Sequence, residues 1–220
     1  MKSMNEYLAR RSNHEDGVKG RFWEGRFGCQ RLLDEASILA CMAYVDLNPV
    51  RARIAESLEN SEFTSAYDRL TAEAAKRKDE GLRIKAKREK TAKQLEQLEE
   101  NARARARASW LVDLDGPEGP IERLSERMYL RLVDLTGRQI REGKRGHISS
   151  EVTPILEALN IDVEAWVENV ENYGKLFYRV AGKVEELIQA AKDSSVRWFK
   201  GHQGSKALFR TPVPEPATSG

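Results

Sequence analysis

Tyr44 and Asn48 are the side chains of this 220-residue chain whose types and spacing best suit chemistry. Residues four apart lie on the same face of a helix, so a phenol and an amide here would point to one spot. The phenol can attack an electrophile, and the amide can hold a metal ion or a phosphate. The pair is therefore a candidate site.

The same two residues also have a purely structural interpretation. A tyrosine near a helix end is commonly a half-buried core residue with its hydroxyl in water. Asn48-Pro49 is an ordinary helix stop, because the residue before proline is pushed out of the helical region. Spacing alone leaves both interpretations open.

The segment that would position the pair, residues 34–47, is predicted to be a buried helix with Asp34 as its N-cap. Its apolar residues form two stripes at helical spacing, Ile38, Met42 and Val45 on one and Leu39, Ala43 and Leu47 on the other. Between them runs a narrower strip that we expect to face a cleft: Ser37, Cys41, Tyr44 and Asn48.

Three motifs in a fixed order carry a family resemblance: GRFWEGRF at 20–27, LDE at 33–35 and ACMAYVDLNPVRA at 40–52. Residues 1–70 resemble the C-terminal part of the REP-associated tyrosine transposases, single-tyrosine members of the HUH nuclease superfamily. These enzymes cleave and join single-stranded DNA through a phosphotyrosine. The resemblance implies that Tyr44 is the nucleophile and that Asn48 helps to complete a site for Mg²⁺ or Mn²⁺.

The chain departs from that family at the metal site, which needs two histidines flanking a hydrophobic residue. The histidines here are His14, His147 and His202, and no His-x-His occurs. A phenol with a pKa near ~10 is a poor nucleophile, and a phosphodiester resists attack until a metal neutralises its charge. We therefore expect an N-terminally truncated remnant that binds neither metal ion and is inactive on its own.

Arginines beside aromatic side chains give candidate contacts with single-stranded or hairpin DNA. Arg21 and Arg26 flank Trp23 in a segment whose alternation predicts a short strand or hairpin. The guanidinium groups would contact phosphates and the indole would stack on a base; alternatively, the tryptophan is core and the arginines are solvated. The other DNA-binding candidates are Arg51, Arg53, Arg103, Arg105 and Arg107.

Composition is typical of a helix-rich soluble chain, with 33% charged residues, 40% hydrophobic residues and a mean hydropathy of −0.63. The net charge of +2 requires any DNA binding to come from local clusters. Cys29 and Cys41 form no disulfide framework, which fits a reducing compartment. No apolar run approaches the ~20 residues of a membrane span. We expect a cytoplasmic protein without a membrane partner.

A mainly α fold in four parts is predicted. Residues 1–61 would be the remnant of an α+β transposase domain, and residues 62–114 a long charged helix that serves as a linker. Residues 120–200 would form a small all-helical domain, and residues 201–220 a disordered tail. Five aromatic side chains of the C-terminal part are predicted to be core: Trp166, Tyr173, Phe177, Trp198 and Phe199.

The helix at 34–47 has apolar faces and little sheet to bury them against. We expect it to dock on the C-terminal helices, to pair with a second copy in a homodimer, or to stay dynamic. Two functions remain open: a DNA-binding relative of the transposases, and a non-enzymatic helical interaction or regulatory protein.

Overall fold

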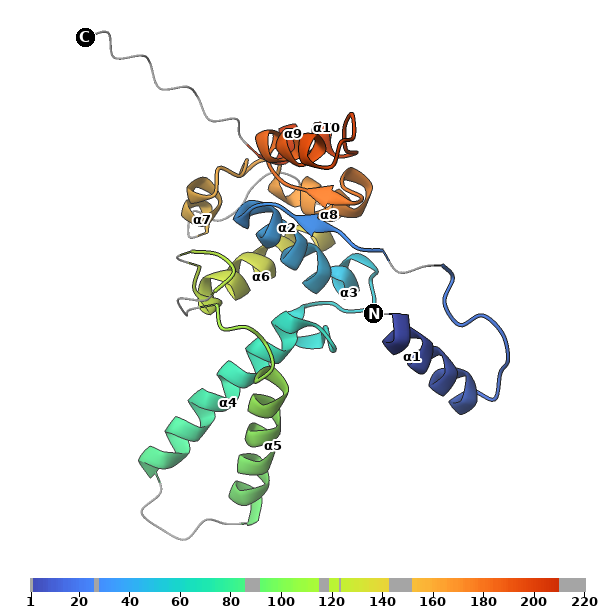
Figure 1. Ribbon diagram of the computed structural model, residues 1–220. Coiled ribbons are helices and arrows are strands. Elements are labelled where there is room, and N and C mark those ends of the chain that lie inside the picture. Colours follow the sequence, from blue (N-terminus) through green and yellow to red (C-terminus); the bar gives the residue numbers. More distant parts are fainter. Residues whose placement is uncertain are drawn as a thin grey trace, which may run out of the picture. The chain divides into compact units, whose positions relative to one another are not determined.

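The computed structural model describes residues 2–25, 28–85, 92–114, 119–122, 124–142 and 152–209. This part of the chain is mainly α-helical, which confirms the predicted fold class (Figure 1). It forms two compact units, residues 1–30 and residues 31–220. Within the described residues, no helix is both long enough and apolar enough to cross a membrane.

The first unit consists of α1 (Lys2–Glu15) and an irregular return segment. The Trp23 indole nitrogen donates to the Asn5 carbonyl at 2.9 Å, and the Phe22 ring packs edge-on against Trp23 at 4.8 Å. The strand or hairpin predicted over residues 20–27 is wrong for residues 21–25, because these side chains pack on a helix rather than pair as strands. Arg26 lies outside the described residues.

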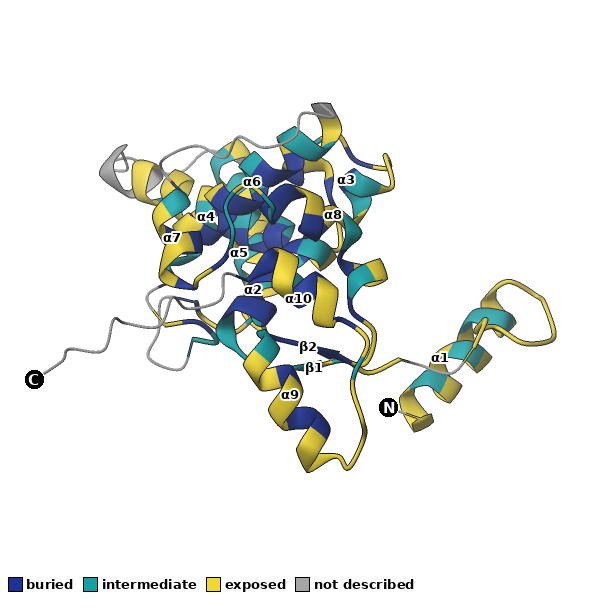
Figure 2. Cartoon of the chain, turned by 90° about the horizontal axis from the view of Figure 1, so that it is seen from above, coloured by how far each residue is buried: buried dark blue, intermediate teal, exposed yellow. Residues whose placement is uncertain are grey.

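The core of the second unit is built by α2 (Glu35–Asp46), α6 (Glu126–Glu142) and α8 (Trp166–Leu176), with the short α3 (Asn48–Arg51) after α2. Figure 2 shows buried segments on α2, α6 and α8. Leu39 and Leu47 of α2 are fully buried in the same cluster as Tyr129 and Trp166. The Trp166 indole donates to Thr136 Oγ1 at 2.9 Å, which satisfies its buried N–H. Three arrangements were expected for the helix at 34–47, and docking on the C-terminal helices is the one confirmed.

Residues near the start of this unit also form hydrogen bonds with residues near its C-terminal end. β1 (Arg31–Leu32) pairs in parallel with β2 (Val180–Ala181), and Asp34 Oδ2 accepts a hydrogen bond from the Lys183 amide at 2.6 Å. Shorter helices complete the unit: the 3-10 helix η1 (Leu58–Asn60), α7 (Thr153–Ala158), α9 (Val184–Asp193) and α10 (His202–Leu208). Residues 31–61 and 120–200 therefore share one core, and the predicted boundary between them is wrong.

The charged segment forms two helices, α4 (Ser65–Lys85) and α5 (Ala92–Ala108), instead of the single long helix predicted. They lie side by side and run in opposite directions (Figure 1). Asp79 of α4 accepts from Asn101 Nδ2 at 2.7 Å and forms an ion pair with Arg105, while Arg107 pairs with Asp68 at 2.8 Å. Small buried side chains on α4, such as Ala72 and Ala75, let the two helices approach closely.

The tail predicted to be disordered from residue 201 instead begins with α10. A Cβ on Gly201, which has φ +127, would lie 2.9 Å from the Phe177 ring, and one on Gly204 would lie 2.8 Å from Leu176 Cβ. Only glycine allows these approaches, and they bury Leu208 and Phe209. Residues 210–220 lie outside the described residues.

The aromatic core prediction holds for Trp166, Tyr173 and Phe177, which are buried. It is wrong for Trp198, which is 68% exposed, because the chain leaves α9 at Asp193 and runs over the surface before α10.

Candidate functional site

The helix that carries Tyr44 begins at a capping box, as expected for Asp34. The Ser37 amide donates to Asp34 Oδ1 at 2.7 Å, and the Asp34 amide donates to Ser37 Oγ at 3.2 Å. At the other end, Leu47 is the C-cap of α2, and Asn48-Pro49 opens α3 instead of continuing the first helix. Proline is well placed in the first turn of α3, where its missing N–H has no helical partner.

The Tyr44 side chain is half-buried between α8 and Arg51. Its ring lies 5.2 Å from the Tyr173 ring, and the Arg51 guanidinium carbon lies 4.1 Å from the Tyr44 ring centroid. The hydroxyl rests against the backbone of α8, because a Cβ on Gly174 would stand 2.6 Å from it. The expectation that this strip of α2 faces an open cleft is therefore wrong for Tyr44, although Cys41 and Asn48 of the same strip line a groove.

Asn48 lies next to the same arginine. Arg51 Nη1 is 3.5 Å from Asn48 Oδ1, and Arg51 Nε donates to the Glu171 carbonyl of α8 at 3.2 Å. Three of the predicted site residues, Tyr44, Asn48 and Arg51, thus come together, and we refer to them as the α2–α3 cluster.

The α2–α3 cluster does not fit a divalent metal ion. Asn48 Oδ1 faces the guanidinium of Arg51, and a fixed positive charge repels a second cation. Within the described ranges, no group of three or more His, Cys, Asp or Glu side chains is arranged to hold a metal.

The α2–α8 interface beside Tyr44 contains a thiol and a phenol. Burial raises the pKa of the Tyr173 hydroxyl, and burial also raises the pKa of the Cys41 thiol, although its hydrogen bond with Tyr173 opposes that rise. Both groups therefore stay protonated at neutral pH. A neutral thiol and a neutral phenol cannot act as the general base that a tyrosine nucleophile needs.

Asp46 is a buried polar centre that the sequence analysis missed. Its carboxylate accepts from the Tyr129 hydroxyl at 2.5 Å and from Ser65 Oγ at 2.8 Å, and so joins α2 to α6 and α4. Burial raises the pKa of Tyr129 well above its ordinary value, and the charge of Asp46 adds to the rise. The sequence feature that could have identified Asp46 is a carboxylate within an otherwise apolar helix, because a buried charge requires polar partners.

The remaining predicted DNA-binding residues are dispersed. Arg21 is exposed and Trp23 is partly exposed, both in the first unit. Arg53 is exposed just after α3, where its φ is +57. Arg103 is exposed on α5, 4.0 Å from Glu99, whereas Arg105 and Arg107 are held by the carboxylates of α4.

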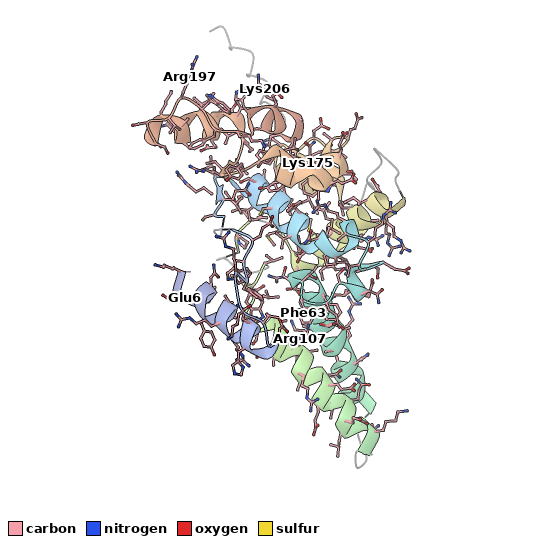
Figure 3. All side chains as sticks on the ribbon, turned by 90° about the vertical axis from the view of Figure 1, so that its right-hand side faces the viewer. Glu6, Phe63, Arg107, Lys175, Arg197 and Lys206 are labelled. Carbon is pink, nitrogen blue, oxygen red and sulfur yellow. The ribbon has the colours of Figure 1, made fainter. Side chains whose placement is uncertain are left out.

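A groove of about 1040 Å³ lies along α2 on the side of Val45, Asn48 and Pro49. Its rim carries Phe63, which is 92% exposed with φ +66, and Trp110, which is 75% exposed. Figure 3 shows Phe63 close to Arg107, which also lines the groove. A bulky residue at positive φ is a backbone outlier.

Comparison of the chain with protein-family models, with curated proteins and with solved structures finds no match.

Proposed function

We propose that this protein is a DNA-binding relative of the REP-associated tyrosine transposases that does not cleave DNA on its own. The observation that carries the proposal is the α2–α3 cluster, in which Arg51 lies 4.1 Å from the Tyr44 ring and 3.5 Å from Asn48. A guanidinium held there neutralises the charge of a phosphate that approaches the exposed Asn48 side of the cluster. The order of the motifs at 20–27, 33–35 and 40–52 supports the same family.

The positive charge of the cluster continues beyond α3. Arg53 is exposed two residues after Arg51, so two guanidinium groups can contact neighbouring phosphates at this edge. Each neutralised phosphate on duplex DNA contributes about −0.9 to the slope of the logarithm of the binding constant against the logarithm of the salt concentration, which we call the log–log salt slope. Phosphate contacts carry no sequence information, so binding through this edge is salt-sensitive and has little sequence preference.

Strand cleavage needs a deprotonated, accessible tyrosine and an activated phosphodiester. The Tyr44 hydroxyl rests against Gly174, its neighbours Cys41 and Tyr173 stay protonated, and Asn48 faces a cation where a metal would bind. The sequence also carries no His-x-His pair. The cluster therefore holds a phosphate without attacking it.

The test combines two gels on the same samples of full-length protein, hairpin DNA and Mg²⁺ or Mn²⁺. We expect a salt-sensitive shift on the native gel and no covalent adduct on the denaturing gel. Arg53→Ala should weaken binding roughly fivefold, equivalent to about 1 kcal/mol for one exposed charged contact. Lys78→Ala, an exposed cation on α4, is the matched control and should change nothing. An adduct that Tyr44→Phe abolishes would contradict the absence of cleavage, and no shift at low salt would contradict DNA binding.

A second candidate function, a helical interaction protein, is favoured by the groove along α2. Phe63 and Trp110 expose large aromatic surfaces on its rim, and exposed apolar patches commonly mark protein interfaces. Sedimentation velocity separates the two functions. A homodimer that Phe63→Ser converts to monomer, together with no DNA shift, would replace the first proposal with the second.

A further inference from the structure

Positive charge gathers in the last part of the described chain. Residues 174–209 contain seven lysine and arginine side chains and three carboxylates, although the whole chain carries a net charge of only +2. The cations are Lys175, Arg179, Lys183, Lys192, Arg197, Lys200 and Lys206. This segment therefore carries a net charge of +4.

These cations are not used to hold the fold together. Within the described residues, none of the seven lies within ion-pair distance of a carboxylate, in contrast to Arg105 and Arg107 of α5. Lys175 has only a neutral partner, the Asn172 side-chain oxygen at 3.3 Å. Their charges are therefore available to an anionic ligand.

Two exposed aromatic rings lie among the cations. Trp198 is 68% exposed between Arg197 and Lys200, and Tyr178 is 67% exposed with the Arg179 guanidinium 5.9 Å from its ring centroid. Both rings therefore present most of their surface to solvent. Alternation of arginine or lysine with exposed aromatic rings is typical of surfaces that bind unpaired bases.

The fold brings the two segments together. Gly201, which follows Lys200, packs against the ring of Phe177, which precedes Tyr178, and Gly204 packs against Leu176 at the end of α8. In Figure 3, Arg197 and Lys206 project from the same outer side of the α9 and α10 layer. We call Tyr178, Arg179, Arg197, Trp198, Lys200 and Lys206 the basic–aromatic surface.

We propose that the basic–aromatic surface binds single-stranded DNA, with bases stacked on Trp198 and Tyr178 and phosphates contacted by the flanking cations. This inference rests on the proposed DNA-binding function and adds a second contact region to the α2–α3 cluster. A single strand fits better than a duplex, because paired bases are stacked inside the helix and cannot reach a side-chain ring. An acidic peptide would match the cations alone and would leave both rings unused.

The test measures binding of the full chain to a fluorescein-labelled oligo(dT) of about 16 nucleotides, a length in the range of single-strand site sizes. We expect Trp198→Ala to weaken binding at least fivefold, as removal of one stacking contact does. Arg197→Ala with Lys200→Ala should flatten the log–log salt slope by about 1.4, since each single-strand contact contributes about 0.7. The matched controls are Trp110→Ala, another exposed tryptophan, and Lys78→Ala; both should bind as the wild type does.

All the substituted side chains are exposed, so unchanged circular dichroism melts should show that the variants fold. If Trp198→Ala and the double variant bind as tightly as the controls while the wild type binds DNA, the inference fails and the proposed function stands. If the wild type binds neither oligo(dT) nor hairpin DNA, both fail. Equal affinity for a duplex of the same length, or equally effective competition by polyglutamate, would also overturn the inference.

Discussion

The contact between the Tyr44 hydroxyl and Gly174 can be measured as an energetic coupling. The three atoms nearest to a Cβ placed on Gly174 all belong to Tyr44, namely the hydroxyl oxygen at 2.6 Å, Cζ at 3.2 Å and Cε2 at 3.8 Å. An added methyl group here is an overpacking, which costs about 1–3 kcal/mol. Because Gly174 lies inside α8, alanine also gains about 1 kcal/mol of helix propensity.

These two effects predict opposite signs in two backgrounds. In the wild type, Gly174→Ala should lower the free energy of unfolding by about 1 kcal/mol, because overpacking exceeds the propensity gain. In Tyr44→Ala the clash is gone, and the same substitution should raise the free energy of unfolding by about 1 kcal/mol. The coupling in this double-mutant cycle is then about 2 kcal/mol.

Urea denaturation of the four proteins, followed by far-ultraviolet circular dichroism, gives the coupling directly provided that the m-values agree. A gain of about 1 kcal/mol in both backgrounds would mean that the hydroxyl does not rest on α8. The phenol would then be free to attack a phosphodiester, and the physical reason given for the lack of cleavage would be refuted.

Three further substitutions test the rest of the second unit. Tyr129→Phe removes a donor from the buried Asp46 carboxylate and should cost about 1.5–3 kcal/mol in urea denaturation. Folding raises the pKa of Tyr129, so the stabilisation that its neutral hydroxyl contributes is complete below pH 10.0 and is lost as the pH rises through the folded-state pKa. Thermal melts should therefore show that the wild type loses more stability above pH 10.0 than Tyr129→Phe does. Phe63→Gly should raise the free energy of unfolding by about 1 kcal/mol, since Phe63 is exposed and strained at φ +66; an unchanged or lower value would refute the strain. Asp79→Ala removes the partner of Asn101 and Arg105 and should speed amide exchange in α5, whereas exposed Glu80→Ala should not; equal exchange in both would mean that these contacts do not hold the hairpin.

The sequence was informative where local patterns decide the structure. The two apolar stripes and the Asp34 cap predicted α2. The α4–α5 hairpin was missed because its contact face uses alanine and ion pairs, which carry no hydrophobic period.

The site was only partly predictable for a similar reason. Spacing placed Tyr44 and Asn48 on one face and the motif order drew attention to Arg51, but nothing local indicates that α8 covers the phenol. That contact joins residues 130 positions apart through the absence of a side chain at Gly174. The exposure of Trp198 likewise depends on where α9 ends and α10 docks, which tertiary packing decides.

A salt titration of hairpin DNA binding, with each sample also run on a denaturing gel, tests most directly whether the protein binds DNA without cleaving it. About four phosphate contacts from the α2–α3 cluster, Arg53 and the basic–aromatic surface predict a log–log slope near −3 and no protein–DNA adduct at any salt concentration. Absence of binding at low salt, or an affinity that does not change with salt, would contradict DNA binding. An adduct that depends on Tyr44 would contradict the absence of cleavage.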